Sequence, residues 1–156
     1  MNVPERMAHL PRRGRFVVGH MFGVDANGVP DFTVLDEAKV LACVRDSTCG
    51  LCGEPIDYWF TFVGGPLSVA NRSFLDPAMH EECARYALSV CPFLLGQHGY
   101  AERPARPGLH RDDEPAIRPD RFALYVTRGF RVRHGVILAL PAKRIEWFVH
   151  GEPHHD

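Results

Sequence analysis

Cys49-Gly50-Leu51-Cys52 places two thiols two residues apart, and His80-Glu81-Glu82-Cys83 repeats that spacing further along the chain. Thiolate sulfur and imidazole nitrogen are ligands that zinc prefers, and a gap of two residues lets both side chains of a pair reach one ion. Four protein ligands leave no position for water, which is typical of a structural Zn²⁺ rather than a catalytic one. The spacing therefore predicts a structural, tetrahedral zinc site whose ligands are Cys49, Cys52, His80 and Cys83.

The residues around the two pairs predict a treble clef, in which a knuckle, a hairpin and the start of a helix share one ion. Gly50 and Gly53 permit the tight turn of a zinc knuckle. Asp76-Pro77 predicts a helix start, because aspartate caps unpaired amides and proline suits the first helical position. The second ligand pair would then lie on one face of that helix, and residues 53–79 leave room for the hairpin.

Catalytic zinc patterns do not fit these residues. Ala84 stands where the zinc-metalloprotease pattern needs its second histidine. The paired cysteines precede the histidine, which is the reverse of the deaminase order. Residues 53–79 also contain no histidine with which a His-Asn-His nuclease would hold a catalytic metal. The plain alternative is that the cysteines are ordinary core residues beside a surface histidine.

The whole chain has 156 residues, five cysteines and no apolar run as long as a membrane-spanning helix. Residues 1–15 are polar and interrupted by proline, unlike the apolar core of a signal peptide. Thiolate ligands also need a reducing compartment. We expect a soluble, cytoplasmic protein without a membrane partner, folded as a single domain over residues 1–156.

Hydrophobic patterns predict an α+β fold in four segments. Residues 15–48 are expected to form an N-terminal strand and a helix that begins at Asp36. Residues 49–93 are the treble-clef zinc segment, with strands at 58–63 and 67–74 and a helix that ends before Cys91-Pro92. Residues 101–120 are a long loop rich in proline and charge. Apolar and polar residues alternate over 121–150, which predicts a three-stranded antiparallel meander. We expect the zinc site to pack beside this sheet.

Charge is distributed unevenly along the chain. Residues 25–98 hold four basic and ten acidic groups, whereas residues 99–156 hold ten basic and eight acidic groups. Affinity for nucleic acid depends on cationic contacts, which argues against the zinc segment lying on a phosphate backbone. On the predicted meander, arginines and aromatics share one face and could neutralise phosphates and stack bases. These residues are Arg131, Arg133, Arg144, Tyr125 and Phe148; an ordinary solvent-facing or covered sheet is the alternative.

The predicted loop at 101–120 contains a second group of side chains that could take part in catalysis or bind a metal. His110, Asp112 and Asp113 have the side chains of general acid–base residues or of a second metal site. A solvated charge cluster explains the same residues.

Several short motifs follow one another along the chain. They are Cys49-Gly50-Leu51-Cys52-Gly53-Glu54-Pro55, Phe62-Val63-Gly64-Gly65-Pro66, Asn71-Arg72, Pro77, His80, Cys83-Ala84, Cys91-Pro92-Phe93, Val126-Thr127-Arg128 and Glu146-Trp147. Together they resemble an uncharacterised family of small treble-clef zinc-finger-like proteins from bacteria and phages. The resemblance covers about two-thirds of the chain. It implies zinc at the four ligand positions and a bacterial or phage origin, and it implies no activity.

The function predicted from these features is an interaction module, stabilised by structural zinc, that binds nucleic acid or a protein partner. Two alternatives remain open. One is a small enzyme whose pocket lies near the His110 loop, and the other is a phage-type inhibitor or adaptor that acts by protein–protein contact.

Overall fold

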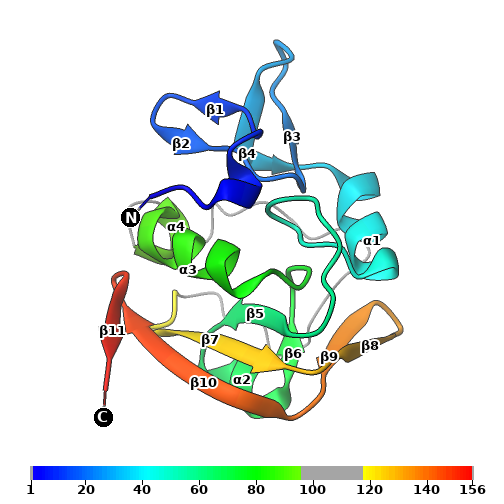
Figure 1. The fold of residues 1–156 in the computed structure, drawn as a ribbon, viewed down its shortest axis with the longest axis vertical. Helices are drawn as coiled ribbons and strands as arrows, with labels where there is room; N and C mark the ends of the chain where they lie inside the picture. Colours follow the sequence, from blue (N-terminus) through cyan, green and yellow to red (C-terminus); the bar gives the residue numbers. More distant parts are fainter. Residues whose placement is uncertain (1, 96–117, 156) are drawn as a thin grey trace.

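The computed structural model describes residues 2–95 and 118–155 and shows an α+β fold with antiparallel sheets (Figure 1). The α+β prediction is therefore confirmed. The largest sheet has four strands, in the order β11 (Glu152–His154), β10 (Ala142–Val149), β7 (Phe122–Thr127) and β5 (Phe60–Gly64). A second sheet has three strands, in the order β6 (Ser73–Phe74), β9 (Val136–Ala139) and β8 (Phe130–Arg133).

The N-terminal part contains two short antiparallel ribbons and one helix. Its elements are the 3₁₀ turn η1 (Glu5–Met7), β1 (Arg12–Arg13), β2 (Phe16–Val17), β3 (Phe22–Val24), β4 (Pro30–Leu35) and α1 (Glu37–Asp46). As predicted, Asp36 caps α1, and its carboxylate accepts a hydrogen bond from the Lys39 amide. The β-rich stretch at 15–22 is divided between β2 and β3. The reason is that the amides of His20 and Met21 bond instead to carbonyls of the cysteine-containing turn.

The expected hairpin over residues 58–74 does not form. Residues 66–71 are the helix α2 (Pro66–Asn71), because Pro66 has the fixed φ of a first helical residue and Gly65 takes the capping position. Arg72, in the left-handed region at φ 52°, ends this helix and leaves only a two-residue strand, β6. Strand β5 therefore pairs with β7 and β6 pairs with β9, rather than with each other.

The predicted three-stranded meander is wrong in its pairing. Strand β10 pairs with β7 directly, and β5 occupies the other edge of β7. The β8–β9 hairpin has no free edge of β7 to join, so it leaves this sheet and is extended by β6. His134 and Gly135 both have positive φ, as a tight hairpin turn requires. Side chains of Tyr125 and Thr127 hydrogen-bond to the Leu140 carbonyl and so hold the return to β10.

Helix α3 (Glu81–Val90) lies between the N-terminal strands and the large sheet, and packs on β5 and β7 (Figure 1). It begins at Glu81 rather than at Asp76-Pro77. Met79 explains the difference, because its amide and carbonyl both bond to Thr61 at 2.8 and 3.0 Å and hold the preceding residues extended. The helix ends before Cys91-Pro92, as predicted, and the short helix α4 (Pro92–Leu95) follows. None of the described helices has the length and apolar character that a bilayer span needs.

Aromatic side chains form the centre of the core. Phe62 of β5 is fully buried and stacks on Phe74 with ring centroids 4.9 Å apart. Phe130 meets the Phe62 ring edge-on at 5.6 Å, and Tyr125 contacts Phe74 at 5.1 Å. Because these rings come from β5, β6, β7 and β8, they join the two sheets.

Replacing Phe62 by alanine should destabilise the fold by about 3–5 kcal/mol, since a buried ring is removed and a cavity remains. Denaturant unfolding followed by circular dichroism measures this change. The Leu41→Ala variant is the control, because Leu41 lies on the exposed side of α1, and its effect should stay within about 0.5 kcal/mol. Equal effects of the two substitutions would contradict the described core.

Candidate metal centre

Four side chains from two parts of the chain meet in one cluster: Cys49, Cys52, His80 and Cys83. Their ligand atoms all lie within 4.8 Å of one another. A tetrahedral ion with sulfur ligands at about 2.3 Å would hold those sulfurs about 3.8 Å apart, so the cluster has the size that such an ion needs. The three cysteines are buried, and every cysteine is a free thiol. The cluster is therefore able to hold a metal ion.

The first two ligands lie on a turn between α1 and β5 that is fixed by its own backbone. The Cys49 amide bonds to the Glu54 carbonyl at 2.9 Å, and the Gly53 amide bonds to the Cys49 carbonyl at 3.0 Å. Gly53 has φ 83°, and a Cβ there would lie 2.8 Å from the His20 ring. Glycine is required at this position on both counts.

Backbone amides in this turn point at the sulfurs. The Cys52 amide lies 3.5 Å from Cys49 Sγ, and the Glu54 amide lies 3.4 Å from Cys52 Sγ. Amide donors stabilise negative charge on sulfur, so the turn favours thiolates at both positions.

His80 is held in one orientation by contacts at both ring nitrogens. Its Nδ1 lies 3.3 Å from Cys52 Sγ, and its Nε2 lies 3.1 Å from the Pro55 carbonyl oxygen. Because a carbonyl accepts but cannot donate, Nε2 carries the proton and Nδ1 is the nitrogen that faces the sulfurs. This pattern, with one nitrogen toward the cluster and the other on a backbone carbonyl, is typical of a metal-binding histidine.

Negative charge on the clustered sulfurs would be stabilised by a bound cation. Hydrogen bonds from Cys52 and Cys83 hold the pKa of Cys49 far below its usual value, while the same interactions raise the pKa of Cys52 and of Cys83. The hydrogen bond to Cys49 also raises the pKa of His80. Negative charges on three sulfurs this close would repel one another. A bound dication would allow all three thiols to ionise.

The turn and the start of α3 connect the surrounding segments. The amides of His20 and Met21 bond to the Leu51 and Gly50 carbonyls at 2.8 and 2.9 Å, and the Gly50 amide bonds to the Ala78 carbonyl at 3.1 Å. Arg6 forms ion pairs with Glu54 of the turn and Glu82 of α3. The N-terminal strands, the turn and α3 are thus attached to each other at the cluster.

The other two cysteines lie outside the cluster. Cys43 is buried in α1, where its thiol contacts the Cys49 carbonyl at 3.9 Å, and burial raises the pKa of Cys43 to about 11. Cys91 follows the last residue of α3 and is half-buried. Neither thiol therefore belongs to the candidate metal site.

The predicted nucleic-acid face is corrected by the structure in three positions. Tyr125 and Phe148 are only 2% and 6% exposed, because β7 is covered on both faces and the β10 end is packed against the core, so neither ring is open to a base. Arg144 forms ion pairs with Glu81 and Glu146, which neutralise it.

Arg131 and Arg133 remain exposed on β8, the edge strand of the second sheet. The remaining predicted site residues, His110, Asp112 and Asp113, lie outside the described residues.

An exposed aromatic pair was not predicted from the sequence. Tyr58 and Trp59 are 54% and 40% exposed and contact each other with ring centroids 4.9 Å apart. The guanidinium of Arg128 lies 3.3 Å from the Tyr58 ring centroid. Phe60 pairs with Thr127 in the sheet, and this register places the aromatic pair beside the start of the β8–β9 hairpin. The adjacent Tyr58-Trp59 dipeptide, immediately before strand β5, was the available signal.

Searches against protein-family models, curated proteins and solved structures found no match. The resemblance to bacterial and phage zinc-finger-like proteins therefore stays a prediction.

Replacing Cys83 by serine should abolish tight metal binding, because only three of the four ligands remain. Elemental analysis of the purified protein should find one metal ion per chain in the wild type and a much lower content in the variant. The matched control is Cys91→Ser, which removes a thiol outside the cluster and should leave the metal content unchanged. An equal fall in metal content in both variants would contradict the assignment.

Proposed function

We propose that the protein is an interaction module, stabilised by structural zinc, whose exposed β8–β9 hairpin binds single-stranded nucleic acid. The observation that carries this proposal is a basic, solvent-exposed edge strand that adjoins an exposed aromatic pair. The two parts of the proposal, the metal and the surface, rest on separate observations.

Zinc is the ion that the ligand set favours. Three thiolates and one imidazole are soft or borderline ligands, which suit zinc better than magnesium or calcium. With all four positions taken by protein, the ion has no place for a reacting water, so its role is to stabilise the fold. We describe the site as a modified treble clef, in which the knuckle and the start of α3 share the ion and β5 takes the place of the hairpin.

The basic surface is supported by the sequence of the C-terminal half. Residues 121–145 contain six basic side chains and no acidic one. Arg131 and Arg133 are exposed, and neither forms an ion pair with any residue that the structure describes. Lys143 and Arg128 are exposed on either side of the hairpin. Exposed cations of this kind are available to neutralise phosphates.

The aromatic pair completes the surface. Tyr58 and Trp59 are large rings that remain open to solvent, and bases of any sequence stack on such rings. Arg128 lies against both of them, with its guanidinium 5.4 Å from the Trp59 ring centroid. Stacking residues beside cations are typical of proteins that bind single strands with little sequence preference.

A protein partner is the second candidate. Among the strands that the structure describes, β8 lies at an edge of its sheet, and Val132 on it is 44% exposed. Such an edge is able to accept an added strand from another chain.

The double variant Arg131→Ala with Arg133→Ala should weaken binding to a labelled single-stranded oligonucleotide, measured by fluorescence anisotropy at several salt concentrations. The slope of log affinity against log salt should become shallower by about 0.7 for each phosphate that the variant no longer neutralises. The control is Arg12→Ala with Arg45→Ala, which removes the same charge from exposed positions on β1 and α1. No binding at low salt, or equal effects of the two double variants, would leave the protein-partner candidate in its place.

Acidification should release the zinc. Thiolates and neutral imidazole bind metal only in their deprotonated forms, so protons compete with the ion as the pH falls. The stability that zinc supplies, on the order of 10 kcal/mol, is therefore present at neutral pH and disappears on the acid side. A zinc indicator and circular dichroism, recorded together during a pH titration, should change in the same pH range. Release of zinc without any change in structure would contradict the structural role.

A further inference from the structure

We propose that a base of the bound single strand stacks on the outer face of the Arg128 guanidinium, whose other face lies on the Tyr58 ring, and that this platform favours purines over pyrimidines. The inference rests on the proposed binding of single-stranded nucleic acid and identifies a stacking position within that surface. It gives Arg128 a role that its charge alone does not provide.

Arg128 is held against Tyr58 by two contacts. It is the first residue after β7, and its side chain donates a hydrogen bond to the Tyr58 backbone carbonyl. Its guanidinium carbon lies 3.3 Å from the Tyr58 ring centroid, which is the separation of stacked planar groups, so the guanidinium lies flat on the ring. The hydrogen bond and the stacking together fix the orientation of this long side chain.

The outer face of the guanidinium is accessible. The Trp59 ring centroid lies 4.9 Å from that of Tyr58 and 5.4 Å from the guanidinium carbon. With 3.3 Å as the third side, these distances form a triangle whose angle at the guanidinium is acute, so both rings lie on the same side of it. Arg128 itself is an exposed residue. A base can therefore approach the face that points away from Tyr58.

A planar, delocalised cation in this position suits a nucleobase. Guanidinium planes stack on aromatic faces, and the bases of single strands stack on arginine as well as on aromatic side chains. Because the Trp59 ring is inclined by 76° to the Tyr58 ring, a base that lies flat on the platform cannot also lie flat on Trp59. Purines have larger π faces than pyrimidines and cover more of the guanidinium, so stacking strength favours purines.

Charges near the platform direct phosphates toward the hairpin. A polar hollow beside the aromatic pair is lined by Asp57, Glu81 and Glu82, and both described arginines that line it form ion pairs with glutamates. Phosphates would meet like charge there. Residues 128–133, by contrast, hold three arginines and no acid, so the backbone of a strand is attracted to that side.

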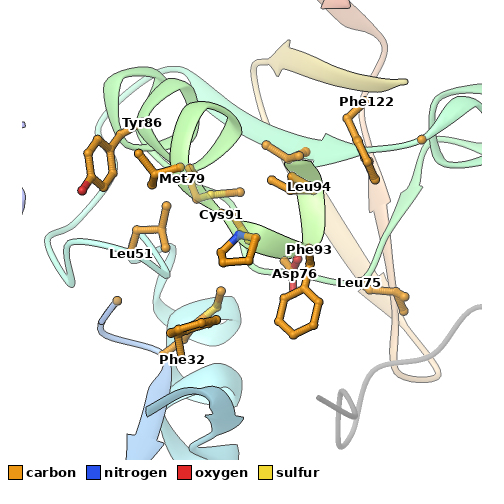
Figure 2. Close-up of a pocket in the computed structure, with 18 of the residues that line it drawn as sticks. Phe32, Leu51, Leu75, Asp76, Met79, Tyr86, Cys91, Phe93, Leu94 and Phe122 are labelled. Carbon is orange, nitrogen blue, oxygen red and sulfur yellow. The ribbon is translucent and has the colours of Figure 1, made fainter. Parts of the chain in front are cut away.

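The apolar cavity of the protein is a separate feature. It has a volume of about 350 Å³ and lies between the N-terminal strands and helices α3 and α4, where Phe32, Leu51 and Met79 line it (Figure 2). Its described lining residues include neither Tyr58 nor Arg128. A base on the platform would therefore lie on the open surface, as a strand that continues in both directions requires.

The test uses the metal-loaded, full-length protein and short labelled strands of thymidine nucleotides, with and without one central adenine. The wild type should bind the adenine-containing strand about threefold more tightly, measured by fluorescence anisotropy. Arg128→Lys keeps the charge but loses the planar group. It should weaken binding about tenfold and abolish the adenine preference, while the slope of log affinity against log salt stays the same.

The matched control is Arg15→Lys, which changes an exposed arginine that lies over another ring, that of Phe16, and should leave affinity and preference unchanged. Equal binding of the two strands by the wild type, or unchanged affinity or a kept adenine preference in Arg128→Lys, would overturn the inference and leave the proposed function in place. No binding by the wild type at low salt would overturn both. If Arg128→Lys fails to fold, Tyr58→Leu decides, because it removes the supporting ring: a kept adenine preference overturns the inference.

Discussion

Three thiols and one imidazole lie so close together that ionised sulfurs would repel one another without a cation. This cluster joins two distant parts of the chain. Cys49 and Cys52 lie on a turn shaped by Gly53, while His80 and Cys83 stand at the first residues of α3. Two backbone hydrogen bonds attach the N-terminal strands to the same turn. Arg85 of α3 pairs with Glu146 of β10 and so extends the connection to the large sheet. A cation at this point would hold the cysteine-containing turn against the start of α3, and the hydrogen bonds and ion pairs named here connect these two segments to the N-terminal strands and the large sheet.

Features set by neighbouring residues could be predicted from the sequence. Asp36 caps α1, Cys91-Pro92 ends α3, and the spacing within each ligand pair identifies residues that do meet. These signals are local, because capping, proline geometry and ligand spacing act over a few residues. Asp76-Pro77 has the same local signal for a helix start, yet the bonds between Met79 and Thr61 delay the helix, so a tertiary contact overrides it.

Features set by pairing between distant strands could not be predicted. Alternation in residues 121–150 is compatible with a meander and with an inserted hairpin, since both place the same residues on alternate faces. The choice depends on β5, which occupies one edge of β7 and is remote in sequence. The same pairing buries Tyr125 and leaves Arg131 exposed, so the candidate nucleic-acid surface consists of β8 arginines and the Tyr58–Trp59 pair.

X-ray absorption at the zinc edge of the purified protein tests the central claim most directly, because it reports both the identity of the metal and its nearest neighbours. The proposed zinc site predicts one zinc per chain surrounded by three sulfur atoms at about 2.3 Å and one nitrogen at about 2.0 Å. A protein that folds without zinc, or a coordination sphere that contains a water oxygen in place of one of the four side chains, would contradict it.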